Sequence, residues 1–268
     1  MIRRVEGTHW LLVKQVDHAA LSGFLAGHIG NGNFARLQPA AITAIGAHDA
    51  GWALHDDCPT LNSAGLPLHV FETPPVLSTR IWNASVAAAE THGAYVALLV
   101  SIHQLALSDL TIRSHRGTRR DVFELNKFQH KQIEQQESLR KQLGMRIDTP
   151  LHLGLAKPGV SEQEDRLRFD FSMLTLCDRL SLELCCGARL FPVIERIIPA
   201  PGAGGLTIRT DMSTDLTLIV NPWPFGSDKL QAEIPARVIR AQPFADVEAF
   251  QVAYAAAPTQ TVRMNLSH

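Results

Sequence analysis

The sequence predicts an α+β fold in which a mainly helical core is followed by a C-terminal antiparallel β-sheet. Between residues 17 and 190, apolar residues recur at the three- and four-residue spacing of helices. From about residue 205 to residue 267, apolar and polar residues alternate as in strands, and prolines and a glycine interrupt them. We therefore expect two domains. Residues 1–200 form a helical domain that begins with strands, and residues 201–268 form a β extension packed on it.

Composition indicates a globular protein that acts on a small molecule. Apolar residues make up 46% of the 268 residues and charged residues 19%, which excludes extended disorder. The formal net charge of −1 gives no electrostatic reason to expect nucleic acid or an anionic membrane as a partner. Without a signal peptide or an apolar run near 20 residues, the chain is expected to be soluble and cytoplasmic. The oligomeric state stays open.

Two short strands and a helix are expected at the N-terminus. Residues 2–5 and 10–13 are apolar runs on either side of a glycine turn. The pattern then changes to a helical period, in which His18 falls on the same face as Leu21 and Leu25. His18 is therefore predicted to point into the core.

A His-Asp doublet ends the second predicted helix. That helix begins at Pro39, which suits a first helical turn, and runs through an apolar stretch to His48 and Asp49. Together these two side chains offer a divalent ion one neutral nitrogen and one anionic oxygen. The next segment, residues 53–76, holds four prolines and is expected to be a long ordered loop.

Two later helices also carry a metal-competent side chain on an apolar stripe. Helices are expected over residues 77–91, 94–109, 121–147 and 162–190. His103 lies on the apolar stripe of the second of these helices, and Asp178 lies among Leu, Phe and Cys residues in the last. Strands are expected at residues 206–210, 216–220, 236–240, 247–254 and 261–265. The N-terminal strands can join their antiparallel sheet.

Four predicted helices thus each place a possible metal ligand on a face that should be buried. An ionised carboxylate in such a place is costly unless it is paired or metal-bound. Each residue also has a plain structural interpretation, since a buried histidine is more often hydrogen-bonded than a ligand and Asp178 can pair with Arg179. The joint pattern favours a metal site. Its predicted ligands are His18, His48, Asp49, His103 and Asp178.

The order His, His-Asp, His, Asp resembles the HD superfamily of metal-dependent phosphohydrolases, which is named for its His-Asp doublet on an all-helical core. The resemblance implies an HD-like core in which His18, the doublet and Asp178 hold one metal and His103 is an intermediate ligand. HD proteins keep two intermediate histidines, whereas His92 is the only other candidate here and lies off the stripe. The expected cofactor is therefore one or two divalent ions of Fe, Mn, Zn or Ni.

A more specific resemblance is to DUF3891, a bacterial family of unknown function. It covers about residues 2–190, through the stretches 15–18, 48–52, 98–103 and 178–182 together with Pro59 and Pro67. Because that family has no assigned activity, this resemblance implies homology and no particular reaction.

The resemblance to HD enzymes implies hydrolysis of a small phosphate ester. Past the doublet lie three candidates for general acid or base, namely His55, Asp56 and Asp57. A solvated turn before Pro59 explains the two carboxylates equally well. The candidates to hold a phosphate are Arg36, Arg113 and His115, and each can equally be an exposed loop charge. Two alternatives use the same polar centre: an HD-type di-iron oxygenase, and a non-catalytic module that binds a small molecule.

Overall fold

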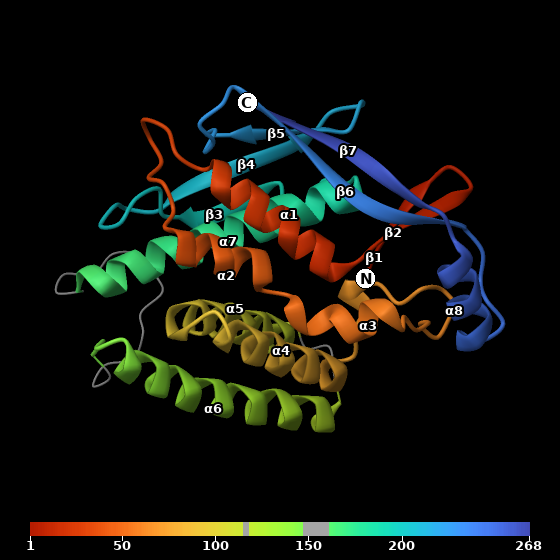
Figure 1. Cartoon of the computed structure of the whole chain (residues 1–268), viewed down its shortest axis with the longest axis horizontal. Coiled ribbons are helices and arrows are strands. Elements are labelled where there is room, and N and C mark those ends of the chain that lie inside the picture. The colour runs from red at the N-terminus through yellow and green to blue at the C-terminus, as the bar shows by residue number, and fades with distance from the viewer. Residues whose placement is uncertain (115–117, 147–160) are drawn as a thin grey trace.

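A single curled sheet of seven strands forms a half-barrel, and the helices lie on one side of it (Figure 1). The computed structural model describes residues 1–114, 118–146 and 161–268. The strands are β1 (Ile2–Glu6), β2 (His9–Val13), β3 (Val193–Ile197), β4 (Leu206–Met212), β5 (Thr217–Asn221), β6 (Lys229–Arg240) and β7 (Thr259–Ser267).

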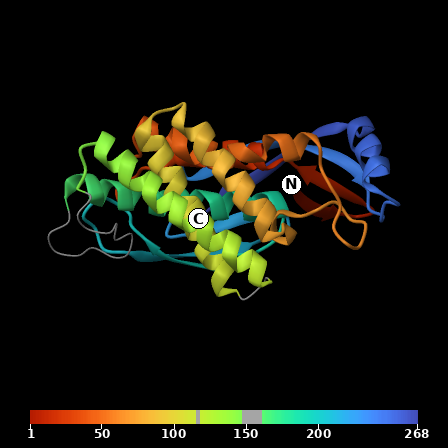
Figure 2. The same ribbon diagram turned by 90° about the horizontal axis from the view of Figure 1, so that it is seen from below.

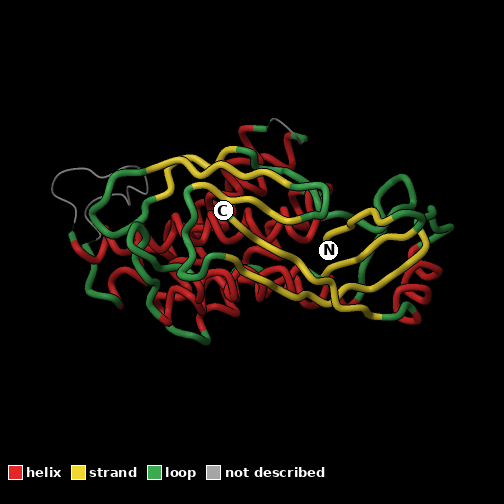
Figure 3. Tube along the Cα trace, turned by 90° about the horizontal axis from the view of Figure 1, so that it is seen from above, coloured by secondary structure: helices red, strands yellow, loops and turns green. Residues whose placement is uncertain are grey.

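The sheet joins the two ends of the chain. Its strand order is β1-β2-β6-β7-β5-β4-β3, so the N-terminal strands pair with β6 near the C-terminus (Figure 3). Neighbouring strands are antiparallel except β5 and β7, which run parallel. Along β6, buried and exposed residues alternate for most of its length, because one face packs on the helices and the other faces solvent.

The helices are stacked away from the sheet in layers (Figures 1 and 2). They are α1 (Gln15–His28), α2 (Pro39–Ala47), α3 (Ala53–Asp57), α4 (Pro75–Glu90), α5 (Ala94–Arg113), α6 (Arg119–Gln142), α7 (Glu162–Cys186) and α8 (Val247–Ala256), with short 3-10 turns η1 (Ala50–Trp52) and η2 (Val70–Glu72). Helices α1 and α7 contact the sheet. Helix α2 packs on both α1 and α7, and α5 packs on α2 and α7. Helices α4 and α6 cover the outer side of α5.

The predicted fold class is wrong. We expected a mainly helical HD-like core with a small C-terminal sheet, whereas 51% of the described residues are helical and 21% lie in strands. The sheet is not an appendage, because it holds strands from both ends of the chain and packs against α1 and α7. Strand β3 was missed because a register shift between Ile194 and Ile197 spoils the alternation that signals a strand.

Two local expectations also need correction. Residues 247–254 were expected to form a strand, but they lie in helix α8. Asp246 accepts a hydrogen bond from the backbone N–H of Ala249 at 2.8 Å, which caps the helix, and Phe250 and Tyr254 bury one face at a four-residue spacing. The expected loop over residues 53–76 contains α3 and η2.

Helix α5 is the one described helix that is long and apolar enough to cross a membrane by length and composition. This corrects the expectation that no such apolar run is present. The helix packs against α2, α4, α6 and α7, and 56% of its most apolar window is buried inside the protein. It is therefore the core helix of a fold of the soluble type.

Candidate metal centre

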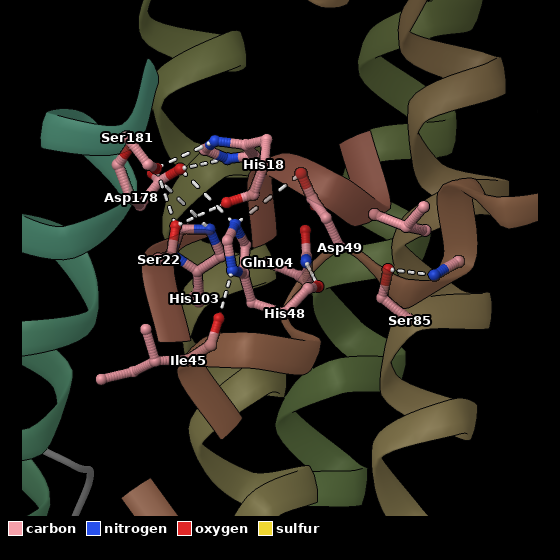
Figure 4. A network of polar contacts seen from close by, with 12 residues as sticks. His18, Ser22, Ile45, His48, Asp49, Ser85, His103, Gln104, Asp178 and Ser181 are labelled. Atoms are coloured by element: carbon pink, nitrogen blue, oxygen red, sulfur yellow. Dashed lines mark hydrogen bonds and ion pairs between the residues drawn. The ribbon is translucent and has the colours of Figure 1, made fainter. Parts of the chain in front are cut away.

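The five predicted ligand residues meet at one point inside the helical layers (Figure 4). They come from α1 (His18), the end of α2 (His48 and Asp49), α5 (His103) and α7 (Asp178). Each has 9% or less of its surface exposed to solvent. Segments that are far apart in the sequence thus bring three imidazoles and two carboxylates together in the core.

The end of α2 lets both residues of the doublet face the same point. Successive residues within a helix diverge by about 100° around its axis. Here α2 ends at Ala47, and Asp49 adopts a non-helical backbone with φ −110° and ψ 22°. A close approach of η1 to α4 follows, in which the N–H of Gly51 donates to Ser85 Oγ at 3.0 Å. A side chain at Gly51 would clash with the carbonyl oxygen of Ile81, so only glycine fits.

The spacing of the ligand atoms suits a small divalent ion. Asp178 Oδ1 lies 3.1 Å from His18 Nε2 and 3.5 Å from His48 Nε2, and Asp178 Oδ2 lies 3.9 Å from His103 Nε2. Asp49 Oδ2 lies 3.7 Å from His48 Nε2. Metal–ligand bonds of about 2.0–2.2 Å separate the ligand atoms by about 3–4 Å. The arrangement thus has the dimensions of a metal site.

Ring nitrogens without a hydrogen-bond partner provide a second test of whether these residues fit a metal ion. The Nδ1–H of His48 donates to the carbonyl oxygen of Ile45 at 2.7 Å, so Nε2 of the neutral ring carries a lone pair. That lone pair faces the carboxylate oxygens of Asp49 and Asp178. His48 Nε2 and His103 Nε2 are buried and have no hydrogen-bond partner. Lone pairs that face one another need a proton or a cation between them, and these residues therefore fit a metal.

The pKa values of the cluster indicate how its charges are balanced when no metal is bound. Burial lowers the pKa of His48, but Asp49 and then Asp178 raise it, and the resulting pKa is about 9. Burial lowers the pKa of His103 to about 3 and raises the pKa of Asp49. Burial also acts to raise the pKa of Asp178, yet the hydrogen bond from His18 and the close approach of the His48 ring hold it well below its ordinary value. A proton on His48 Nε2 would thus face the two carboxylates, in the place that a divalent cation would take.

Comparison with known proteins gives the family. A family model described as "Protein of unknown function (DUF3891)" matches residues 1–241. The chain belongs to the DUF3891 family. The match extends well beyond the expected limit near residue 190 and includes strands β3 to β6 of the sheet. No curated protein and no solved structure matches the chain, and nothing in the comparisons supports a link to the HD superfamily.

Three further polar residues of this DUF3891 protein support the ligands, and the sequence reasoning did not single them out. Ser181 Oγ lies 2.9 Å from His18 Nδ1 and 2.7 Å from Ser22 Oγ. The amide of Gln104 donates to the backbone oxygen of His48 at 2.7 Å. The sequence did contain a feature that could have identified them, because all three are polar residues on or beside the apolar stripes that carry the ligands. These contacts orient the ligand side chains, as the outer partners of metal ligands do.

Replacing Ser181 by alanine is expected to weaken metal affinity about 10- to 100-fold, the usual cost of losing such an outer partner. The substitution removes the contact that fixes the ring of His18 and leaves every ligand atom in place. A zinc titration followed by calorimetry measures the effect. The matched control is Ser172→Ala on the same helix, whose hydroxyl donates to backbone oxygens of Phe169 and Ile198. Equal losses in the two variants would contradict a specific role for Ser181.

The three acid–base candidates occupy the neighbouring helix α3 of the DUF3891 protein and have other contacts. Asp56 accepts from the N–H of Val16 at 3.2 Å, and burial raises its pKa to about 6. Asp57 forms an ion pair with Lys14 at 2.6 Å. His55 packs its ring against a tryptophan, Trp52. The contacts of Asp56 and Asp57 attach α3 to the start of α1, and a catalytic role for the three residues stays a prediction.

Two of the three predicted phosphate-binding residues, Arg36 and Arg113, lie in the described part of the chain, and neither contacts the centre. Arg36 is exposed and packs over Gly30. Arg113 is exposed and pairs with Asp109, and it lies ten residues past His103, about 15 Å along α5. His115 lies outside the described residues.

Proposed function

We propose that this protein is a metal-dependent hydrolase of a small phosphate ester, with one divalent ion of Fe, Mn, Zn or Ni held between α1, the end of α2, α5 and α7. The observation that carries the proposal is the buried meeting of three imidazoles and two carboxylates, in which two Nε2 atoms have no hydrogen-bond partner. Imidazole and carboxylate are ligand types that suit these ions.

One ion is favoured over two. The ligand atoms form two groups, His18 with His48 and Asp49, and His48 with His103 and Asp178. Both groups contain His48, whose Nδ1–H donates to the carbonyl oxygen of Ile45 and leaves only Nε2 for a metal. A single nitrogen lone pair binds a single ion. The shared histidine therefore favours a mononuclear hydrolase over a di-iron oxygenase.

The chain's own residues orient the reacting group and exclude water. A divalent ion bound here would lower the pKa of a water molecule toward neutrality and polarise a phosphoryl oxygen. Asp178 has the most exposed side chain of the cluster at 13%, followed by Asp49 at 8%, while His48 is closed off at 1%. Solvent thus reaches the centre on the side of the carboxylates, where we expect the substrate to approach.

The proposal extends to the compartment and the partners. All four cysteines, Cys58, Cys177, Cys185 and Cys186, are free thiols, as expected in a reducing environment such as the cytoplasm. The partner that we propose is a small-molecule substrate, with no role for nucleic acid or membrane.

Metal analysis combined with an ester assay tests the function. Protein purified without added metal is expected to carry one Fe, Mn, Zn or Ni ion per chain and to hydrolyse p-nitrophenyl phosphate only when that ion is bound. His48→Ala is expected to lose both the ion and turnover, whereas His92→Ala, an exposed histidine between α4 and α5, should keep both.

Two results would contradict the hydrolase. Two irons per chain with a visible absorption band would indicate the oxygenase. Failure to bind any of these ions on titration would leave a small-molecule binding module.

A further inference from the structure

Arg179 is a half-buried cation without an anionic partner in the part of the chain that the structure describes. It follows Asp178 on α7, but the carboxylate of Asp178 is turned toward the histidines. The guanidinium of Arg179 lies over the ring of Phe191, with its central carbon 5.4 Å from the ring centroid. A partly desolvated cation of this kind is costly until an anion arrives.

A cavity of about 320 Å³ opens at this arginine. Its lining residues are Arg179, Val193, Glu195 and Arg196. Neither guanidinium forms an ion pair or hydrogen bond with a described residue, whereas Arg263 on the sheet pairs with Glu233 at 2.9 Å. Two cations against one carboxylate give the wall a net positive charge.

The bulge in β3 places the second arginine at this cavity. Ile194 and Ile197 are both buried, and the register with β4 shifts between them. In a regular strand, alternation would turn either Glu195 or Arg196 toward the core. The bulge leaves both outside, and Arg196 adopts φ 60°, a conformation that residues with side chains seldom adopt. Such strained residues concentrate at functional sites.

We propose that Arg179 and Arg196 bind a phosphate group of the substrate beside the metal centre. Guanidinium groups bind phosphate through paired, charge-assisted hydrogen bonds. Arg179 directly follows Asp178 on α7, and the two side chains leave the helix in different directions. An anion in this cavity therefore lies next to the segment of α7 that carries a ligand, but not at the ligand atoms themselves. The inference rests on the proposed hydrolase for its catalytic meaning, but the anion site itself exists without the metal.

Direct binding of inorganic phosphate to chelator-treated protein tests the site without relying on turnover. Calorimetry is expected to show binding that weakens about tenfold or more in Arg179→Gln and in Arg196→Gln, because each loses hydrogen bonds between charged groups. Arg179→Lys, which keeps the charge, should retain part of the affinity. Glu195→Gln should bind phosphate more tightly, since it removes a repelling carboxylate. The control Arg263→Gln should bind as the wild type does.

The outcomes separate this site from the proposed function. No phosphate binding, or equal losses in Arg263→Gln and Arg179→Gln, would overturn the anion site even if metal and turnover are found. Phosphate binding that depends on both cavity arginines would support the site even in a protein that takes up no metal. In an active enzyme, the arginine variants should raise KM for the ester and leave the metal content unchanged.

Discussion

Asp178→Asn is expected to reduce metal occupancy to the background of the measurement. Asp178 is the only carboxylate among the described residues within 4 Å of all three histidines of the cluster, through its two oxygens. Asparagine keeps the shape but removes the negative charge and one oxygen ligand. The loss in affinity should exceed the roughly 10- to 100-fold that follows from losing an outer partner. Elemental analysis and a zinc titration measure it.

A surface carboxylate provides the control for Asp178. Asp228→Asn changes an exposed residue between β5 and β6 and should leave the metal content at one ion per chain. Circular dichroism of both variants separates loss of the site from loss of the fold. If folded Asp178→Asn protein bound the ion with wild-type affinity, Asp178 would not be a ligand and the centre would have to be built from the other four residues.

Removal of the metal is expected to lower Tm by about 8–16 °C. A ligand present at about 1,000 times its Kd stabilises the folded state by about 4.1 kcal/mol, and 1 kcal/mol shifts Tm by about 2–4 °C in a chain near this size. The proposed ion would bridge four separate helical segments, and its loss would leave two buried carboxylates with only a proton to offset their charge. Thermal unfolding with and without a chelator measures the difference.

The stabilisation by metal should grow as pH rises from 6.5 to about 9. The pKa of His48 in the folded protein is about 9, above the ordinary 6.5, because Asp49 and Asp178 outweigh burial. Its protonation therefore stabilises the metal-free fold fully below pH 6.5, and this contribution is lost as pH rises through 9. Metal binding needs the neutral ring, so it also strengthens over the same range. If the difference in Tm between metal-bound and metal-free protein shrank over this range, His48 would not be the titrating ligand. The His48→Gln variant should show no such change of the Tm difference with pH.

The helical period alone was enough to predict which faces are buried. His18, His103 and Asp178 lie on apolar stripes in the sequence, and each is almost fully buried in the structure. This prediction works because side chains three and four residues apart share a helix face whatever the helix packs against. The same reasoning does not choose between a ligand and a hydrogen-bonded core residue.

An antiparallel sheet joined by the N-terminal strands was expected, but the order of its strands was beyond prediction because strand pairing depends on residues far apart in the chain. Nothing local in β2 indicates that it pairs with β6, more than 200 residues later. The bulge in β3 hid a strand, and the alternation in residues 247–254 hid a helix whose capping residue, Asp246, was the stronger signal. Taking the sheet for a small appendage led to the wrong fold class.

The sequence by itself determined which imidazole and carboxylate side chains form the centre's candidate ligands, which helices carry them and on which helix faces they lie. These features follow from local spacing. Only the tertiary structure decided that the five side chains meet and that His48 has a single free nitrogen. It also showed that Arg36 and Arg113 do not contact the centre, and that Arg179 and Arg196 line one cavity. Such convergence is set by how α1, α2, α5 and α7 pack on one another and on the sheet. Helical spacing carries no information about the angle or the depth at which two helices cross.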